Sequence, residues 1–296
     1  IWNFDTPTAP VVLDVNVEGR DIPAVVQATK QGWLYSFNRL TGEPIWPIVE
    51  RPVPPSIIPG EVLSPTQPHV TWPEPYSMQG IGEDDLVDFT PELKEQALTI
   101  LNGYRVGGLY VPQLPDTYEG EYINNIGCIG GGNIINHPPA ADPTSGMMFN
   151  SHRRNCFAPG FMGATNGVAR DNPNYPEPGE GGATPNSTPT TGKTVAAWLP
   201  GAGRRRGGLP TIDGLPIYKR MNNQLTAYQM NSGEKGWSLP VGQTPEEYEN
   251  HPLLEGIDVP NSGGTGWSVQ MVTGDLLVQT RALSEGMAQI EPDAPL

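Results

Sequence analysis

The chain has 296 residues, a formal net charge of −15 and a sequence pI of about 4.6. So acidic a chain is not expected to bind nucleic acid, because its surface would repel phosphate groups. Glycine and proline, with 36 and 34 residues, make up nearly a quarter of the sequence and are interleaved with valine, isoleucine, tryptophan and tyrosine. This mixture favours an all-β fold of many short strands and turns. No apolar stretch approaches the length of a transmembrane helix.

The first sixty residues predict four short antiparallel strands. Residues 11–17 (VVLDVNV) alternate apolar and polar side chains, and the strand-like segments 22–29 and 33–39 follow after short turns that contain glycine. Another turn, at 40–43, leads to a fourth apolar segment at 44–48. Strands joined in this way form an antiparallel meander. Four of them have the size of one blade of a β-propeller.

A ten-residue pattern recurs along the chain and supports this interpretation. FNRLTGEPIW (37–46) and YQMNSGEKGW (228–237) share an aromatic residue, an asparagine, a hydroxyl residue before Gly-Glu, and a tryptophan four residues after the glycine. AADPTSGMMF (140–149) is a weaker third copy. Such a recurring turn is typical of propellers, in which an aromatic side chain packs one sheet against the next. We therefore expect Trp46 and Trp237 to pack between blades.

The copies are farther apart than bare blades would be. We therefore expect one partial β-propeller domain over residues 1–296, with insertions at about 51–110 and 158–210. The first insertion begins rich in proline. The second is rich in glycine, proline, asparagine and threonine, has almost no periodic pattern, and predicts an extended surface segment.

One helix is predicted, within residues 90–104 (TPELKEQALTILNGY). Thr90 suits the N-cap and Pro91 the first helical position. The helix would present one apolar face, formed by Leu93, Ala97, Ile100 and Leu101.

Motifs for other chemistry are incomplete. TTGKT (190–194) lacks the glycine that a phosphate-binding loop needs five residues before Gly192, and the glycine-rich segment 127–132 is not followed by the acidic strand and helix of a dinucleotide fold. The four histidines show no metal-ligand spacing. Cys128 and Cys156 could form a disulfide, which would suit an oxidising compartment, or remain two thiols.

Several long segments, in the same order along the chain, carry a family resemblance. They are residues 2–54, SPTQP (64–68), DDLVDFTPEL (84–93), the segments around GGGNI and ADPTSGMMF, the segments around GLPIYK and LTAYQMNSGEKGW, and NHPLLEGIDVP (250–260). They resemble the dehydrogenases that depend on pyrroloquinoline quinone (PQQ), in particular the glucose, quinate and polyol group. The resemblance spans nearly the whole chain except 158–205.

This resemblance implies a propeller of eight four-stranded blades, of which the chain would hold roughly half. It also implies PQQ as cofactor, together with Ca²⁺ or Mg²⁺. The expected reaction is oxidation of a sugar or alcohol hydroxyl in the periplasm. Any association with a membrane would come through a segment that is absent from this sequence. Electrons would pass to a quinone or a cytochrome. The cofactor would carry the redox chemistry, and the protein would position and polarise it.

Two residues match family positions near the cofactor. Lys30, in ATKQG, matches the lysine that contacts the quinone oxygens, where its charge would stabilise the reduced cofactor. The alternative for Lys30 is a turn lysine exposed to water. Asn133 matches the asparagine of the family's GGAN turn. Ile134 follows it where the family often has tryptophan, which weakens the case for substrate stacking there.

Asn3 stands where the family has the aspartate proposed as catalytic base, at the same spacing to Lys30. An amide cannot accept a proton as a carboxylate can, although its carbonyl oxygen could bind the divalent cation. Asp5 would face the same side of an extended strand and could replace the base, but a structural role is favoured.

Two functions therefore remain open from the sequence. The first is a PQQ-dependent sugar or alcohol dehydrogenase, and the second is a non-catalytic propeller that has lost the catalytic aspartate and serves in binding or assembly. Half a propeller would leave open sheet edges. We therefore expect a further segment or a second chain to complete it.

Overall fold

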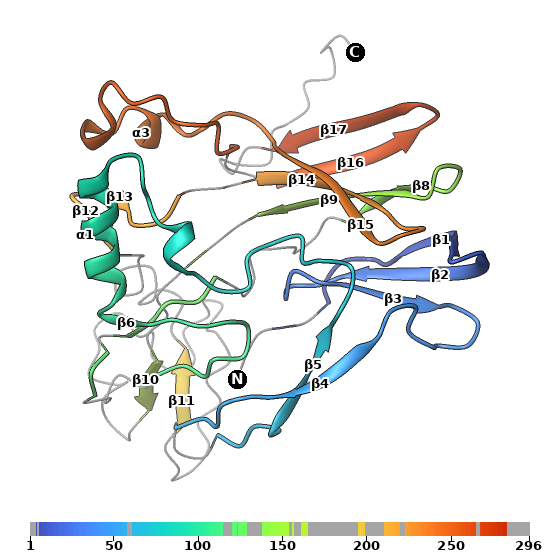
Figure 1. Ribbon diagram of the computed structural model, residues 1–296, viewed down its shortest axis with the longest axis horizontal. Coiled ribbons are helices and arrows are strands. Elements are labelled where there is room, and N and C mark those ends of the chain that lie inside the picture. Colours follow the sequence, from blue (N-terminus) through green and yellow to red (C-terminus); the bar gives the residue numbers. More distant parts are fainter. Residues whose placement is uncertain are drawn as a thin grey trace, which may run out of the picture.

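The computed structural model describes residues 4, 6–57, 61–114, 120–122, 124–128, 138–153, 156, 161–164, 195–198, 210–219, 223–264 and 267–282. These residues form mostly short strands in separate antiparallel sheets, together with a few helical turns (Figure 1). None of the helices in these ranges is long and apolar enough to cross a bilayer.

The first sheet is an antiparallel meander of β1 (Val11–Val17), β2 (Arg20–Ala28) and β3 (Leu34–Asn38). Its first turn has two central residues with positive φ, Glu18 (53°) and Gly19 (80°), as the tightest hairpin turns require. Every second side chain of β1, starting at Leu13, is buried. The alternation read from the sequence therefore identifies the core face of this sheet correctly.

The fourth strand expected at 44–48 does not form. Only a single bridge joins Phe37 and Pro44. The chain then turns away as β4 (Ile48–Pro52), which pairs with β5 (Thr66–Val70) in a separate hairpin. Pro44 and Pro47 lack the backbone N–H groups that a continuous ladder needs, which explains why the predicted strand does not form.

The second sheet is a complete four-stranded blade. It contains β8 (Ala140–Asp142), β9 (Met147–Arg153), β14 (Asn223–Gln229) and β15 (Glu234–Pro240), all antiparallel and in the order β15-β14-β9-β8. The long segment between β9 and β14 leaves this meander at one end. Its described parts include the hairpins β10 (Phe161–Ala164) with β11 (Val195–Trp198) and β12 (Thr211–Ile212) with β13 (Leu215–Pro216).

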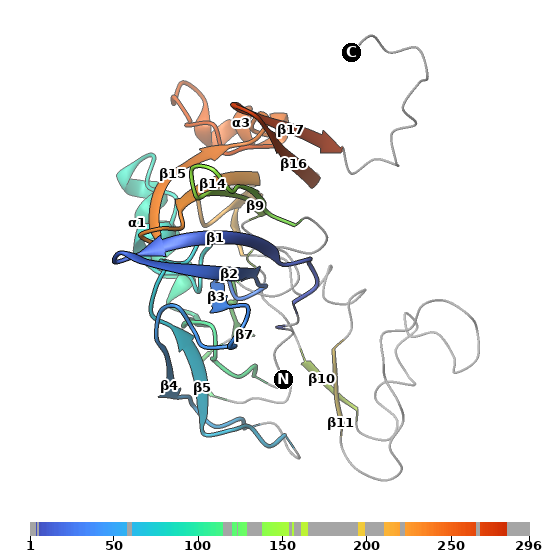
Figure 2. The ribbon, with the colours of Figure 1, turned by 90° about the vertical axis from the view of Figure 1, so that its right-hand side faces the viewer.

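A third sheet, the hairpin of β16 (Trp267–Thr273) and β17 (Leu276–Ala282), follows the blade. β1 lies against β8, and β16 lies against β8 and β9. Figure 2 shows the three sheets as successive layers, with β1–β3 below β9, β14 and β15, and β16–β17 above them. An apolar core of Leu13, Val15, Val26, Met148 and Tyr228 fills the space between the first two layers. Successive sheets packed face to face are the arrangement of propeller blades.

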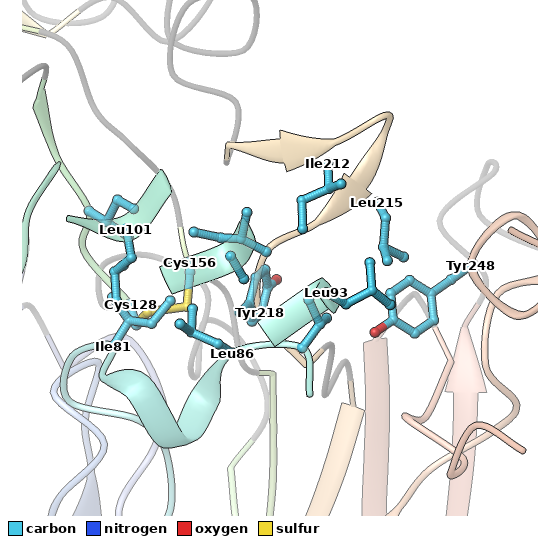
Figure 3. Close-up of a cluster of buried hydrophobic side chains, with 14 of the residues drawn as sticks. Ile81, Leu86, Leu93, Leu101, Cys128, Cys156, Ile212, Leu215, Tyr218 and Tyr248 are labelled. Atoms are coloured by element: carbon cyan, nitrogen blue, oxygen red, sulfur yellow. A yellow bond between two sulfur atoms is a disulfide. The ribbon is translucent and has the colours of Figure 1, made fainter. Parts of the chain in front are cut away.

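The predicted helix is α1 (Pro91–Leu101), and its N-cap is the expected one: the Thr90 hydroxyl accepts a hydrogen bond from the Leu93 N–H at 3.2 Å. Leu93, Ala97 and Leu101 are buried and Ile100 packs beside them, so the predicted apolar face is confirmed. Figure 3 shows this face within a second core, which also contains Ile212, Leu215 and Tyr218.

Smaller elements surround this second core. They are the helical turns Glu83–Asp85, α3 (Glu246–Glu249) and Pro252–Leu254, and the short parallel pair β6 (Tyr104–Arg105) and β7 (Asn124–Asn125). Cys128 and Cys156 form a disulfide inside the core, which settles the alternative left open by the sequence (Figure 3).

The three copies of the recurrent sequence pattern form the same turn. Each glycine has a positive φ and donates its N–H to the carbonyl four residues earlier, and the preceding hydroxyl accepts from the backbone N–H two residues later. The glycines are Gly42, Gly146 and Gly233, and the hydroxyl residues are Thr41, Ser145 and Ser232. The copies differ in position, because the turn at 142–147 joins the first two strands of its blade whereas the other two follow a third strand.

The two tryptophans of the pattern pack differently. Trp46 belongs to the core between the first two sheets, and a Cβ placed on Gly233 would lie 3.0 Å from its ring, so Trp46 reaches the turn of the neighbouring blade as expected. Trp237 instead lies against Phe149 of its own sheet, with ring centroids 6.0 Å apart, and stays 37% exposed. The expected packing between blades is therefore found for Trp46 only.

Candidate functional site

Lys30 lies in the tight turn between β2 and β3. The Thr29 N–H donates to the carbonyl of Trp33 at 3.1 Å, and Gly32 closes the turn with a φ of +84°. Only 6% of Lys30 is exposed, so the alternative of a turn lysine in water is wrong. A buried ammonium group at the end of a strand is a site for negative charge.

A distant segment, residues 76–79, holds this turn from outside. The Tyr76 N–H donates to the Gly32 carbonyl at 2.9 Å, and the Tyr76 hydroxyl donates to the Thr29 carbonyl. The Gln79 side chain donates to the Gln31 carbonyl at 3.1 Å. Three carbonyl groups around Lys30 are thus bound by one segment, which fixes the backbone that carries the ammonium group. We call residues 76–79 the clamp.

The chemistry of Tyr76 suits this role. Its ring is 3% exposed, and burial raises the pKa of its phenol far above the ordinary value. The phenol therefore stays protonated and remains a hydrogen-bond donor. A matching donor in the same interface is Tyr228, whose hydroxyl donates to the Glu74 carbonyl at 2.7 Å.

An aromatic group joins the Lys30 turn to the beginning of the described chain. The Gln31 side chain donates to the Tyr110 hydroxyl at 3.1 Å, and this hydroxyl donates to the Pro68 carbonyl at 3.0 Å. The ring of Phe4 meets the Tyr110 ring edge-on, with centroids 5.5 Å apart, and the Trp33 ring lies tilted to the Tyr110 ring with centroids 6.3 Å apart. Burial raises the pKa of Tyr110, which keeps its hydroxyl neutral.

Phe4 is therefore placed next to the Lys30 turn through Tyr110 and Gln31. Its two neighbours, Asn3 and Asp5, lie outside the described residues. Asn133 and Ile134, in the glycine-rich segment, lie outside them too. The structure thus describes Lys30 alone among the four predicted site residues.

The interface between the first two sheets becomes polar near Lys30. Asn150, His152 and Thr226 replace the apolar side chains found farther along β9 and β14, and all three are buried. The rings of Tyr76 and His152 lie 5.1 Å apart. In the sequence, His152 is one of four histidines without metal-ligand spacing. Its neighbourhood depends on pairing between strands separated by a long insertion, so no local signal indicates it.

The described residues contain no group of three or more histidine, cysteine or acidic side chains that could hold a metal ion. The expected ligand Asn3 falls outside them. Among the described residues Lys30 therefore represents the predicted site, and the cation ligand stays a prediction.

Successive sheets packed face to face, one of them a complete four-stranded blade, define part of a β-propeller. Residues 1–288 match the PQQ family described as "Glucose/ethanol/alcohol dehydrogenase, beta-propeller domain". The chain therefore belongs to the family of PQQ-dependent dehydrogenases, whose members use PQQ together with a metal ion.

Relatives in this family have a range of substrates in their names. The chain is 27% identical over 244 residues to a quinate/shikimate dehydrogenase (quinone) of Acinetobacter baylyi, covering 82% of this chain and 28% of that protein. It is 26% identical over 317 residues to the glycerol dehydrogenase large subunit of Gluconobacter oxydans, covering 98% and 39%. The chain thus spans less than two fifths of either relative.

Among solved structures, a europium-containing methanol dehydrogenase is similar to the chain. The sequence identity is 12% and the TM-score 0.34, over 80% of this chain and 28% of that one.

Proposed function

We propose that the protein oxidises a hydroxyl group of a sugar, polyol or related alcohol with PQQ as its cofactor. The observation that carries this proposal is Lys30, a buried lysine in a turn held by the clamp, within a chain that matches the PQQ family over residues 1–288. PQQ, when bound, supplies a quinone that accepts two electrons from the substrate.

Lys30 has two tasks in this proposal. Its ammonium group binds the anionic cofactor, and it stabilises the negative charge that develops on the quinone oxygens during reduction. A charge that acts in this way must be in place before the reaction, and the bonds from the clamp provide such preorganisation.

The proton of the substrate hydroxyl needs a base, and position 3 is where the family resemblance places it. Asn3 cannot accept that proton, so Asp5 is the nearest carboxylate in the sequence. In our proposal Asn3 holds substrate or the divalent cation, Ca²⁺ or Mg²⁺, through its carbonyl oxygen, and Asn133 lies beside the cofactor.

We propose a polyhydroxylated small molecule as substrate, because the names of the relatives include quinate, shikimate, glycerol and glucose. Electrons would leave to a quinone or a cytochrome. The disulfide between Cys128 and Cys156 supports a periplasmic location, because disulfides persist in oxidising compartments.

The second candidate function is a propeller that binds or assembles without catalysis. Asn3 favours it, because the carboxylate expected there is missing. Under this alternative the propeller fold would remain while turnover is lost.

Cofactor uptake and turnover by the full-length protein separate the two functions. PQQ is added with Ca²⁺ or Mg²⁺, binding is followed by absorbance, and reduction of a dye is measured with glucose, quinate and glycerol. We expect uptake, and Lys30→Gln should weaken it by about tenfold or more because one charge-assisted contact is lost. Absence of uptake would overturn the enzyme proposal. Uptake without turnover, restored by Asn3→Asp, would show the non-catalytic alternative.

A further inference from the structure

A row of polar side chains crosses the second sheet from its buried interface to the solvent. His152 lies on β9, Thr226 on β14 and Ser238 on β15, so the row follows three adjacent strands. His152 Nε2 is 2.9 Å from the Thr226 hydroxyl, which is 2.9 Å from the Ser238 hydroxyl. His152 and Thr226 are 3% and 0% exposed, whereas Ser238 is exposed.

We propose that His152, Thr226 and Ser238 form a proton relay that connects the surroundings of Lys30 with the solvent. The proposal rests on the proposed function, because a dehydrogenase must dispose of protons. It adds a route that the family resemblance does not supply.

The three groups have the chemistry that a relay needs. An imidazole ring and a hydroxyl can each accept a hydrogen bond on one side and donate on the other. In a row of such groups, each group accepts a proton from one neighbour and donates its own proton to the next, so that one proton is transferred from end to end. Apolar side chains fill the same interface at Met148 and Tyr228, so packing alone does not require a histidine and a threonine here.

The inner end of the row lies near the Lys30 turn. The His152 ring is 5.1 Å from the ring of Tyr76, whose hydroxyl is bound to the Thr29 carbonyl beside Lys30. Asn150 is fully buried on the face of the sheet that His152 occupies. Its side-chain amide interacts with the Tyr76 hydroxyl, so that Tyr76, Asn150 and His152 form one polar cluster. This cluster connects the Lys30 turn, through Tyr76, with the side of the second sheet that carries His152.

The proton balance requires such a route. Oxidation of one hydroxyl to a carbonyl releases two electrons and two protons from the substrate. The electrons go to a quinone or a cytochrome, and the protons must leave the buried site. His152 takes a proton at Nδ1 and gives one from Nε2 to the Thr226 oxygen. Thr226 gives its own proton to Ser238, and Ser238 gives one to water.

The other titratable groups near His152 do not replace it. Tyr76 and Tyr228 face the same interface, and burial raises the pKa of both phenols far above neutrality. Arg153 follows on β9, and although burial lowers the pKa of its guanidinium from the ordinary value, an arginine stays charged at neutral pH. His152 is therefore the described group in this interface whose ordinary pKa lies near neutral pH.

Exchange of the His152 ring proton with water tests the relay without any cofactor. The full-length protein is labelled with ¹⁵N-histidine, and the exchange rate of the Nε2 proton is measured by NMR, with His152→Gln assigning the signal. Thr226→Val removes the middle hydroxyl at nearly constant shape and should slow exchange on the order of tenfold or more. The matched control is Thr8→Val, because Thr8 is also buried and its hydroxyl meets no partner among the described residues.

The enzyme with bound PQQ provides the second measurement. Thr226→Val should slow the step in which a one-electron dye reoxidises the reduced enzyme and should raise the solvent isotope effect of that step. Ser238→Ala should change both less, because water can take the place of an exposed hydroxyl. Equal exchange rates in Thr226→Val and wild type overturn the relay, whether or not PQQ binds. Failure of PQQ uptake alone would overturn the proposed function instead.

Discussion

The hydroxyl groups of Tyr76 and Tyr228 make two hydrogen bonds of the same kind. The effect of losing one can therefore be compared with the effect of losing the other. Both are buried tyrosines between the first two sheets, and both donate to a backbone carbonyl. Only the carbonyl bound by Tyr76, that of Thr29, belongs to the turn that carries Lys30. The pair therefore separates the role of a hydrogen bond in stability from its role in positioning Lys30.

We predict that Tyr76→Phe and Tyr228→Phe lower the free energy of unfolding by similar amounts, about 1–2 kcal/mol, because each removes a hydrogen bond from a buried phenol to a backbone carbonyl. Only Tyr76→Phe should also weaken PQQ binding, by about tenfold, because the Lys30 turn loses one of its bonds to the clamp. Urea unfolding and absorbance titration measure the two effects. Equal PQQ affinities in both variants would contradict the positioning role.

At the scale of elements, the recurrent turn shows how one sequence pattern serves different surroundings. Gly42 and Gly233 occupy the same position of this turn, with φ of +78° and +75°. A Cβ on Gly42 would meet nothing within 4 Å, whereas one on Gly233 would lie 2.2 Å from Trp72 Nε1. The Trp72 indole also donates to the Ser232 carbonyl at 2.7 Å, so it cannot move away without losing that bond.

We predict that Gly42→Ala costs about 1 kcal/mol of stability, since only the left-handed backbone conformation opposes the new methyl group. Gly233→Ala should cost about 2–4 kcal/mol, because it also displaces Trp72 from the turn. Thermal and urea unfolding of the two variants provide the comparison. A similar loss in both would show that Trp72 does not hold the second sheet to its neighbour.

How well an element could be predicted depended on how local its determinants are. The helix was predicted with its cap because Thr90 and Pro91 act within one turn, and the alternation in 11–17 identified a buried face. The prediction of a fourth strand was wrong because it relied on the strand-like composition of residues 44–48. Pro44 and Pro47, which lack a backbone N–H, argue against a strand there. The clamp and His152 could not be predicted, since residues 76–79 reach Lys30 from 46 positions away and carry no periodic pattern.

At the scale of the whole molecule, the disulfide adds a covalent link between two parts that also meet without it, where the Val87 N–H donates to the Ile217 carbonyl. Cys128 follows β7 beside the helical core, and Cys156 follows β9, the strand of the second sheet that carries His152. Both side chains are buried in the core that packs against α1. The bond therefore ties a blade of the propeller to the helical insertion.

We predict that breaking this bond lowers the free energy of unfolding by about 3.5 kcal/mol, the loop-closure value for its 28-residue separation. Urea unfolding of wild type with and without reductant measures the loss without changing a side chain. The variant with both Cys128→Ala and Cys156→Ala should be destabilised by at least as much, because two small cavities are added, and should not respond to reductant. A wild-type protein indifferent to reductant would contradict the link. Peptide mapping of protein exported to the periplasm should find the two cysteines joined, whereas protein retained in the cytosol should hold them as thiols.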